Sequence, residues 1–468
     1  MLDVSKEDIL EGSIPKVLVT LTLPMIATQL ILIVQQFVDI FWLGRLDEAA
    51  VAAVGLVTPL MGFLFFGTSI GAIGGQIVVS QRIGGGDEVG ARRTAFNAVL
   101  VSAAITLVFA VVVNVFATSI VGLFTADPTV HTDAVTYITV VAFGIVLASV
   151  SDTLEGAFVA WGDSRMPLLA TVLAIATNVV LDPIFIFGWG PIRPMGVRGA
   201  ALATLLGMGI AAVFNFGVAA SGRRAFSLTW NSLRFNPEMS REIVTIGVPR
   251  GSQQLVRHVT QLLLVVMASI SAGPAGLAAY MIGFRVLGLT KAVSYSISNA
   301  ATSVIGQNVG ADSSDRANRT TWVAVGMAVA AGLLLAVIQV AAPGAIVHFL
   351  SPKLHGRAYR LTVDALVVLA FGYWASAAII AVEAGFNGAG QTRITMLSSI
   401  AQNWGLLVPM AALGVFGLEN GFESIFWATT LSSGLVAIGL CAYYYYSASG
   451  GMLQRASAHA AQRAEATD

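Results

Sequence analysis

The chain has 468 residues, of which 56% are hydrophobic and 11% are charged, whereas ordinary soluble domains carry roughly 25% charged residues. Its 25 basic and 25 acidic side chains give a formal net charge of zero, so nothing indicates a nucleic-acid partner. The single cysteine, Cys441, excludes an internal disulfide. This composition is typical of an integral membrane protein and argues against a soluble enzyme.

Long apolar stretches follow one another along nearly the whole chain. A helix needs about 20 mostly apolar residues to cross a membrane. We therefore predict twelve transmembrane helices, near residues 17–43, 50–80, 94–123, 133–160, 167–189, 197–220, 243–271, 276–305, 321–350, 361–387, 394–416 and 421–447.

The connections between these stretches predict the orientation, because cytoplasmic loops carry an excess of lysine and arginine. With the N-terminus inside, fifteen basic residues fall on the cytoplasmic side and six on the opposite side. We therefore expect a multi-pass protein of the cell (plasma) membrane with both termini in the cytoplasm.

The two halves of the chain repeat each other. The segment from Gln81 to Gly84 (QRIG) returns as Gln307 to Gly310 (QNVG), and at nearly the same offset the segment from Glu155 to Phe158 (EGAF) returns as EAGF, beginning at Glu383. Each half contains six predicted spans, so the second half enters the membrane from the same side and the repeats are parallel. The predicted fold is all-α integral membrane, with twelve transmembrane helices in two parallel six-helix repeats.

We predict four regions from this repeat. They are an N-terminal six-helix lobe (1–220), a cytoplasmic linker (221–241), a C-terminal six-helix lobe (242–447) and a cytoplasmic tail (448–468). Two similar bundles around a central cleft are the plan of a transporter, and alternating access is the expected motion.

Two acids interrupt the predicted spans of the N-terminal lobe. Asp39 lies near the outer end of the first span, and Asp182 lies in the fifth, one helical turn after Asn178. A carboxylate inside a bilayer costs a few kcal/mol even on lenient scales and usually marks a functional site. Counted along their helices at about 1.5 Å per residue, Asp39, Asp182 and Thr204 all lie some 7–10 Å below the outer surface.

These oxygen-bearing side chains suit a small cation. Carboxylate, amide and hydroxyl oxygens are hard ligands for Na⁺, and two close carboxylates repel each other, so that one of them accepts a proton instead. Both H⁺ and Na⁺ therefore stay open as the coupling ion. The alternative is structural: an acid in a span can also cap a helix or pair with a basic residue such as Arg257 or Arg285.

Several short motifs occur through the first half of the chain. They are Leu23-Pro24, Val38-Asp39-Ile-Phe-Trp42-Leu-Gly44, Gly162-Asp163-Ser-Arg165-Met-Pro167, Asn178-Val-Val-Leu-Asp182-Pro183 and the segment from Gly196 to Thr204. Together they resemble the multidrug and toxic compound extrusion (MATE) family, within a superfamily that also contains polysaccharide and lipid flippases. The resemblance covers roughly residues 13–447.

The resemblance implies a cation site in the N-terminal lobe, as in the DinF-like and archaeal members. It places this site at Asp39, Asn178, Asp182 and Thr204, and it adds Tyr137 as a residue that lines the same lobe.

Three further positions are implied by the same resemblance. Pro24 matches a proline associated with bending of the first helix, and we consider it a candidate hinge. Arg257 and Ser376 stand where the NorM-like branch carries the acids of its C-terminal site, which favours the DinF-like branch.

Other polar residues in the spans are candidates for the substrate cleft or for gating. They are Tyr137, Gln35, Gln36, Gln253, Arg257 and Arg285. A lone polar residue in a span can equally well join two helices.

The sequence favours a secondary antiporter that exports amphipathic, often cationic organic compounds in exchange for H⁺ or Na⁺. We expect no cofactor and no enzymatic activity, and partners limited to small organic substrates and the lipid bilayer, with the protein acting as a monomer. The alternative is a flippase for lipid-linked oligosaccharides, which the arginines of the second half favour. An intramembrane hydrolase using Ser69 with His258 and a passive channel are weaker hypotheses.

Overall fold

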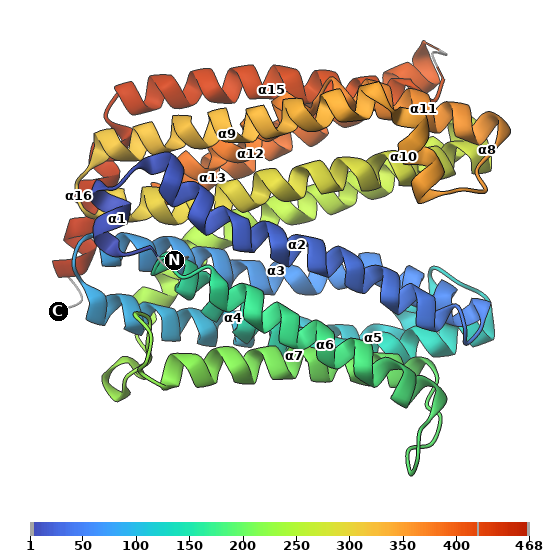
Figure 1. Ribbon diagram of the computed structural model, residues 1–468, viewed down its shortest axis with the longest axis horizontal. Helices are drawn as coiled ribbons and strands as arrows, with labels where there is room; N and C mark the ends of the chain where they lie inside the picture. The colour runs from blue at the N-terminus through green and yellow to red at the C-terminus, as the bar shows by residue number, and fades with distance from the viewer. Residues whose placement is uncertain (1–3, 419–420, 466–468) are drawn as a thin grey trace. The chain divides into compact units, whose positions relative to one another are not determined.

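The computed structural model describes residues 4–418 and 421–465, and these contain many helices and no β-strand (Figure 1). One isolated bridge joins Trp189 and Ile192. The predicted all-α class is therefore confirmed.

The helices follow the apolar stretches. Those of the first half are α1 (Lys6–Glu11), α2 (Ile14–Leu43), α3 (Glu48–Gly84), α4 (Glu88–Gly122), α5 (Pro128–Ala160), α6 (Arg165–Phe187), α7 (Val197–Ala220) and the short η1 (Trp230–Ser232). Those that follow are α8 (Pro237–Gly310), α9 (Ser314–Ala341), α10 (Pro343–Leu350), α11 (Gly356–Ala370), α12 (Tyr373–Gly388), α13 (Thr392–Ile400), η2 (Ala401–Leu407), α14 (Val408–Ala412), η3 (Leu413–Gly417), α15 (Ser424–Ser449) and α16 (Met452–Glu465).

Among the described residues, ten helices are long and apolar enough to cross a membrane, and one bent helix pair adds an eleventh span. The longest, α8, has 74 residues, but its backbone leaves the helical region at Gly273, where φ is 60° and ψ is −149°. A straight helix of that length would measure about 110 Å, whereas a hydrocarbon core is about 30 Å thick. The helix α8 therefore supplies two spans, and the total agrees with the twelve predicted.

Two predicted spans differ in detail from the observed helices. The span expected over 321–350 stops at Ala341, because Ala342 has an extended φ of −144° and Pro343 begins the separate helix α10. The span expected over 361–387 is bent by 49° between α11 and α12.

The described chain divides into two compact units. The first comprises 1–11, 20–252 and 460–468, and the second comprises 12–19 and 253–459. The segment 221–241, which the sequence predicts to be a linker, packs with the first unit, and the boundary falls inside α8 between Ser252 and Gln253. The four regions proposed above stay a prediction.

Close helix packing builds the first unit. The helix α3 packs most extensively against α5 and α4, and α7 packs against both α5 and α6. Glycines permit this: a Cβ at Gly71 would lie 2.3 Å from Cβ of Ser102 on α4, and one at Gly199 would lie 2.5 Å from the backbone of Phe185. The hydrophobic effect does not drive helices together within lipid, so close van der Waals packing at small residues stabilises the helix pairs instead.

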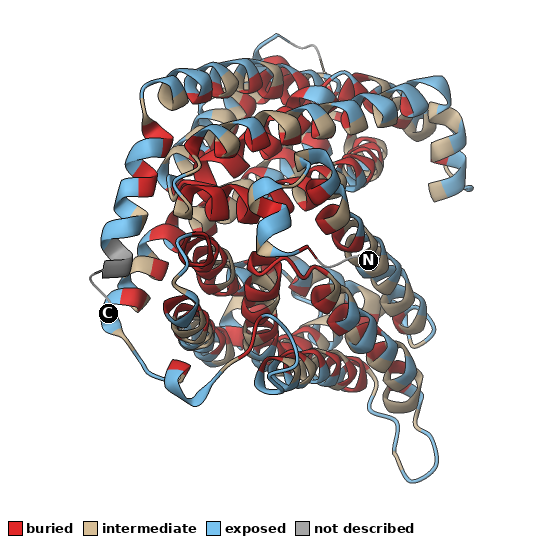
Figure 2. Cartoon of the chain, turned by 60° about the vertical axis from the view of Figure 1, so that its left-hand side comes forward, coloured by how far each residue is buried: buried red, intermediate tan, exposed pale blue. Residues whose placement is uncertain are grey.

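Large apolar side chains cover the outer faces of many helices. Val115 on α4 is 70% exposed and Val213 on α7 is 74% exposed. Figure 2 shows exposed and buried residues on opposite sides of individual helices. Exposed apolar faces on helices of spanning length are the surface that lipid tails solvate, which agrees with a membrane protein.

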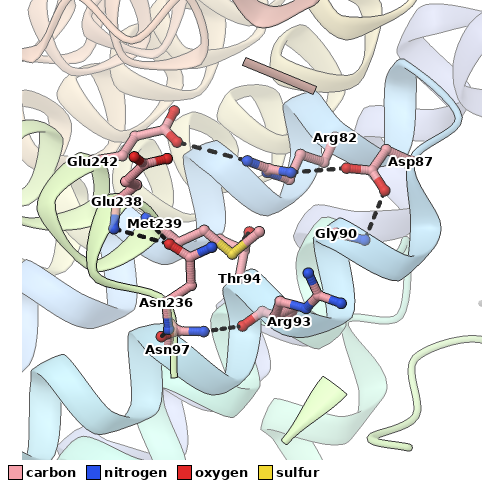
Figure 3. Close-up of polar contacts among 10 residues, drawn as sticks. All are labelled: Arg82, Asp87, Gly90, Arg93, Thr94, Asn97, Asn236, Glu238, Met239 and Glu242. Atoms are coloured by element: carbon pink, nitrogen blue, oxygen red, sulfur yellow. Dashed lines mark hydrogen bonds and ion pairs between the residues drawn. The ribbon is translucent and has the colours of Figure 1, made fainter. Parts of the chain in front are cut away.

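A polar network ties the segment before α8 to the rest of the first unit (Figure 3). The fully buried Asn97 on α4 donates through Nδ2 to the carbonyl groups of Arg93 (2.8 Å) and Arg234 (3.0 Å), and its Oδ1 accepts from the Asn236 backbone N–H at 2.8 Å. Nearby, the buried Arg82 pairs with Asp87 at 2.8 Å. The contacts of Asn97 hold the segment that leads into α8, and Arg82 also reaches Glu242 on α8 at 3.9 Å.

Replacing Asn97 by alanine should lower the stability of the protein. The change leaves a carbonyl group and a backbone N–H without partners in a buried place, which costs roughly 1–3 kcal/mol for a group left unsatisfied. Thermal unfolding in detergent would measure it. Asn114→Ala is a matched control, because among the described residues the Asn114 side chain on the same helix hydrogen bonds only to Ala110, one turn before it. A loss as large as that of Asn97→Ala would contradict the assignment.

Candidate functional site

Four helices of the first unit bring the predicted cation-site residues together. The helix α2 supplies Asp39, α6 supplies Asn178 and Asp182, and α7 supplies Thr204. Tyr137, on α5, joins them. Their proximity follows from the sequence positions, since Asp39 and Asp182 lie near the last turns of their helices and Thr204 lies near the first turns of α7.

Asn178 is at the centre of the hydrogen bonds in this cluster. Its side-chain amide donates to Oδ1 of Asp182 at 3.3 Å and to Oγ1 of Thr204 at 3.5 Å. Its Oδ1 accepts from Nε2 of Gln35 on α2 at 3.3 Å. Gln35, predicted as a residue of the substrate cleft, therefore lies against the cation-site residues. These bonds link α2, α6 and α7.

Thr204 and Tyr137 complete the cluster on its other side. The Thr204 hydroxyl donates to the carbonyl of Ala200 one turn before it at 3.0 Å, and the Tyr137 hydroxyl lies close to it. Tyr137 is itself buried within the core formed by α3, α5 and α7. A buried tyrosine on a packed core fixes the position of the hydroxyl groups next to the acids.

The carboxyl groups of Asp39 and Asp182 lie within hydrogen-bonding range of each other. Two carboxyl groups this close are stable only when a proton or a cation lies between them, because two carboxylates repel each other. The Oδ1 atom of Asp39 is buried and accepts no hydrogen bond from any described residue. This oxygen is therefore available to a proton or a small cation.

No basic residue neutralises these acids within the part of the chain that the structure describes. Neither Asp39 nor Asp182 forms an ion pair with a residue in 4–418 or 421–465. The structural alternative, pairing with Arg257 or Arg285, finds no support in these contacts. Buried acids without basic partners in a membrane protein mark ion and proton pathways.

The donor set fits a monovalent cation or a proton better than a divalent metal. Within the described parts of the chain, no group of three or more His, Cys, Asp or Glu residues could hold a metal ion. The cluster offers two carboxylates, an amide and two hydroxyl groups. Calcium takes 6–8 oxygen ligands, commonly with several carboxylates, so these oxygens suit Na⁺ or H⁺ better.

Aromatic rings lie one turn beyond the acids towards the ends of the same helices. Trp42 on α2 and Phe187 on α6 meet edge to face, with centroids 6.1 Å apart. Trp42 follows Asp39 by about one helical turn, so the rings lie on the side of the acids nearest the helix ends.

Two predicted residues of α2 stay outside the cluster. Gln36 is exposed, and no contact joins it to the cluster within the described residues. Pro24 lies inside a continuous α2, where its carbonyl accepts a hydrogen bond from Thr28 at 3.0 Å. The role of Pro24 as a hinge stays a prediction.

The other candidates belong to a separate cluster in the second unit. Gln253, fully buried on α8, donates to Oε1 of Glu383 on α12 at 2.6 Å. Arg257 reaches Oε2 of Glu383 at 3.5 Å and donates to the Tyr295 hydroxyl. Arg285 is exposed on α8. A further basic residue, Lys291, lies within electrostatic range of Arg257. It was not predicted from the sequence, although an isolated basic residue within an apolar span is a signal of function.

Comparisons with known proteins agree with this architecture. The family model described as MatE matches residues 24–184 and 249–413. The multidrug export protein MepA of Staphylococcus haemolyticus is 23% identical over 440 residues, which cover 92% of each chain.

Solved structures give the same fold. A MATE crystal structure in complex with MaL6 superposes with a TM-score of 0.89 at 22% identity, covering 96% of this chain and 99% of that one. The outward-facing conformation of a multidrug resistance MATE transporter of the MOP superfamily superposes with a TM-score of 0.87 at 22% identity, covering 97% and 99%.

Proposed function

The chain belongs to the MatE family, and from this premise we propose that it is a secondary antiporter that exports amphipathic, often cationic organic compounds. Inward movement of H⁺ or Na⁺ through the Asp39–Asp182 cluster drives the export. The name of the MepA relative, a multidrug export protein, supports export of varied organic compounds. Membership of a transporter family supports transport rather than catalysis.

One observation carries the proposed coupling: two carboxyl groups from different helices meet without a basic partner among the described residues, and a buried oxygen of Asp39 lacks a donor there. An ion bound at this place links α2 to α6, and its departure leaves two carboxylates that repel each other. The position of α2 relative to α6 therefore depends on the ion.

This dependence gives antiport if the two positions of α2 differ in affinity for substrate. Coupling of two sites is reciprocal, so an ion that favours the low-affinity state lowers substrate affinity, and substrate lowers ion affinity by the same factor. Alternating access of the two lobes converts this exchange of ligands into transport. Gln35 and Asn178 transmit the change, since their hydrogen bond joins the same two helices.

A flippase for lipid-linked oligosaccharides is the second candidate, and the basic cluster at Arg257 favours it. A flippase does not need the acid pair of the first unit, so dependence of transport on an ion gradient distinguishes the two functions. An intramembrane hydrolase has less support: the Ser69 hydroxyl donates to the Phe65 carbonyl of its own helix at 2.8 Å.

Purified protein in liposomes should accumulate a fluorescent lipophilic cation such as ethidium when one ion gradient is imposed. A tenfold ion gradient corresponds to about 1.4 kcal/mol, so one-for-one exchange should concentrate a monovalent cation up to about tenfold. Imposing a proton gradient and a sodium gradient separately identifies the coupling ion.

Empty liposomes and liposomes with both gradients dissipated are the controls. If ethidium equilibrates but never accumulates against its own gradient, the protein is a passive channel. If neither gradient moves ethidium while a fluorescent lipid crosses the bilayer, the flippase replaces the antiporter as the account of function.

A further inference from the structure

The second unit contains basic side chains that the proposed coupling chemistry does not use. From Gln253 to Gly310, α8 carries Arg257, Arg285 and Lys291 and no acidic residue. The first unit has the opposite character, since its spans bring two acids together without a base among the described residues. Charged residues inside spans are energetically unfavourable and face protein or water rather than lipid. The opposite charges of the two units therefore need a physical explanation.

The two arms of α8 bring Arg257 and Lys291 to a similar depth. Arg257 lies before the helix break at Gly273 and Lys291 lies after it, at nearly the same distance along the helix. Both therefore lie about 24–27 Å along their arms from the break. Hydrogen bonds between the arms hold them side by side: Tyr280 donates to the Gln261 carbonyl at 3.4 Å, and Arg257 donates to Tyr295.

The charge of Arg257 is already balanced. Glu383, which is 1% exposed, accepts from Gln253 through Oε1 and from Arg257 through Oε2. The Tyr295 hydroxyl accepts a further hydrogen bond from Arg257, and the guanidinium carbon lies 5.6 Å from the centroid of the Tyr295 ring. These contacts fix the orientation of the guanidinium, whose side chain is still 24% exposed.

Lys291 has no such balance. It is half-buried, and it forms no hydrogen bond or ion pair with any residue in 4–418 or 421–465. Its electrostatic neighbour is Arg257, which has the same charge. A partly buried ammonium group without an anion is unfavourable. A positive charge in excess at a partly accessible place attracts anions.

We infer that Lys291 and Arg257 bind an acidic group, a carboxylate or a phosphate, of a compound that the protein moves. Arginine recognises both groups through its planar fork of donors, and lysine adds a point charge. This inference rests on the proposed transport function and adds to its substrate class: compounds with an acidic group beside an apolar body. The acidic group belongs either to a water-soluble compound or to a phospholipid.

Binding of carboxyfluorescein to the full-length protein in phosphatidylcholine nanodiscs tests the site. Lys291→Gln removes the unbalanced charge and breaks no hydrogen bond or ion pair with a described residue. We expect it to weaken carboxyfluorescein binding about tenfold or more, the loss expected for one charge-assisted hydrogen bond, and to leave ethidium binding unchanged. Lys291→Arg should restore most of the affinity, whereas the loss of a buried structural contact would weaken both ligands.

Arg319→Gln is the matched control, because Arg319 is an exposed basic residue of α9 in the same unit. A second set of nanodiscs that contain phosphatidylglycerol distinguishes the two sources of the anion. If a phospholipid occupies the site, phosphatidylglycerol should weaken carboxyfluorescein binding to the wild type and not to Lys291→Gln. If a soluble compound occupies it, phosphatidylglycerol should have no effect.

Two results together contradict the inference. Carboxyfluorescein binds the wild type and Lys291→Gln with equal affinity or binds neither, and phosphatidylglycerol likewise affects both proteins equally or affects neither. Gradient-driven ethidium transport by the same preparations tests the proposed function separately. Coupled ethidium transport without anion binding would contradict the anion site but not the antiporter. Anion binding without coupled transport would contradict the antiporter but not the anion site.

Discussion

Asp39→Asn is expected to abolish uphill transport of ethidium while leaving the protein folded. Asparagine keeps the size of the side chain and its capacity to bond to Asp182, so α2 and α6 stay in contact. It cannot bind or release a proton, and it removes the negative charge that a sodium ion requires. Accumulation should fall from about tenfold to none, because an exchange that carries no ion receives no energy from the gradient.

Exchange of ethidium at equal concentrations on both sides separates coupling from binding. This exchange needs no ion gradient, and we expect Asp39→Asn to retain part of it. Glu48→Gln is the matched control, because it removes an exposed acid from the first turn of α3 in the same unit. If Asp39→Asn accumulates ethidium as the wild type does, the ion does not pass through this cluster.

Gly247→Ala is expected to cause the largest loss of stability. A Cβ at this position would lie 2.2 Å from the carbonyl oxygen of Ile70 on α3, and real Cβ atoms essentially never come within 3.0 Å of another heavy atom. The reverse contact is also too close, since a Cβ at Gly74 would lie 2.5 Å from the carbonyl oxygen of Ile243. Backbone atoms of two packed helices cannot move aside as a flexible side chain can.

Overpacking of this kind costs typically 1–3 kcal/mol, and we expect about 3 kcal/mol for Gly247→Ala because the opposing atoms are backbone. Thermal unfolding in detergent measures the loss. Gly288→Ala is the control in the same helix, since a Cβ at Gly288 meets nothing within 4 Å. If both variants unfold at the wild-type temperature, α3 and α8 are not in this close contact.

The sequence predicts the spans well, because burial in lipid requires a long apolar helix and leaves a simple pattern. It fails where the backbone departs from a regular helix. The break at Ala342 depends on one extended residue before Pro343, and the bend between α11 and α12 lies within an uninterrupted apolar stretch. A proline inside α2 leaves that helix continuous, so proline alone does not locate the breaks.

The sequence predicts the candidate site to the extent that the site depends on how deep each residue lies in the membrane. Asp39, Asp182 and Thr204 meet because each lies a similar distance from the same ends of three helices. The sequence could not predict which of the adjacent residues Gln35 and Gln36 contacts Asn178, because the rotation of α2 about its axis decides this. The role of Lys291 also depends on helix pairing, because its neighbour Arg257 lies on the other arm of α8, beyond the break at Gly273.

Measuring the number of ions released when substrate binds is the most direct test of the coupling proposed for Asp39 and Asp182. Ethidium would be added to purified protein in weakly buffered detergent, while a pH dye reports released protons and bound ²²Na⁺ reports released sodium. We predict release of about one ion per ethidium bound by the wild type, and almost none by Asp39→Asn, because reciprocal coupling requires that the two ligands displace each other. Equal release by both proteins would contradict an ion site at this carboxyl pair.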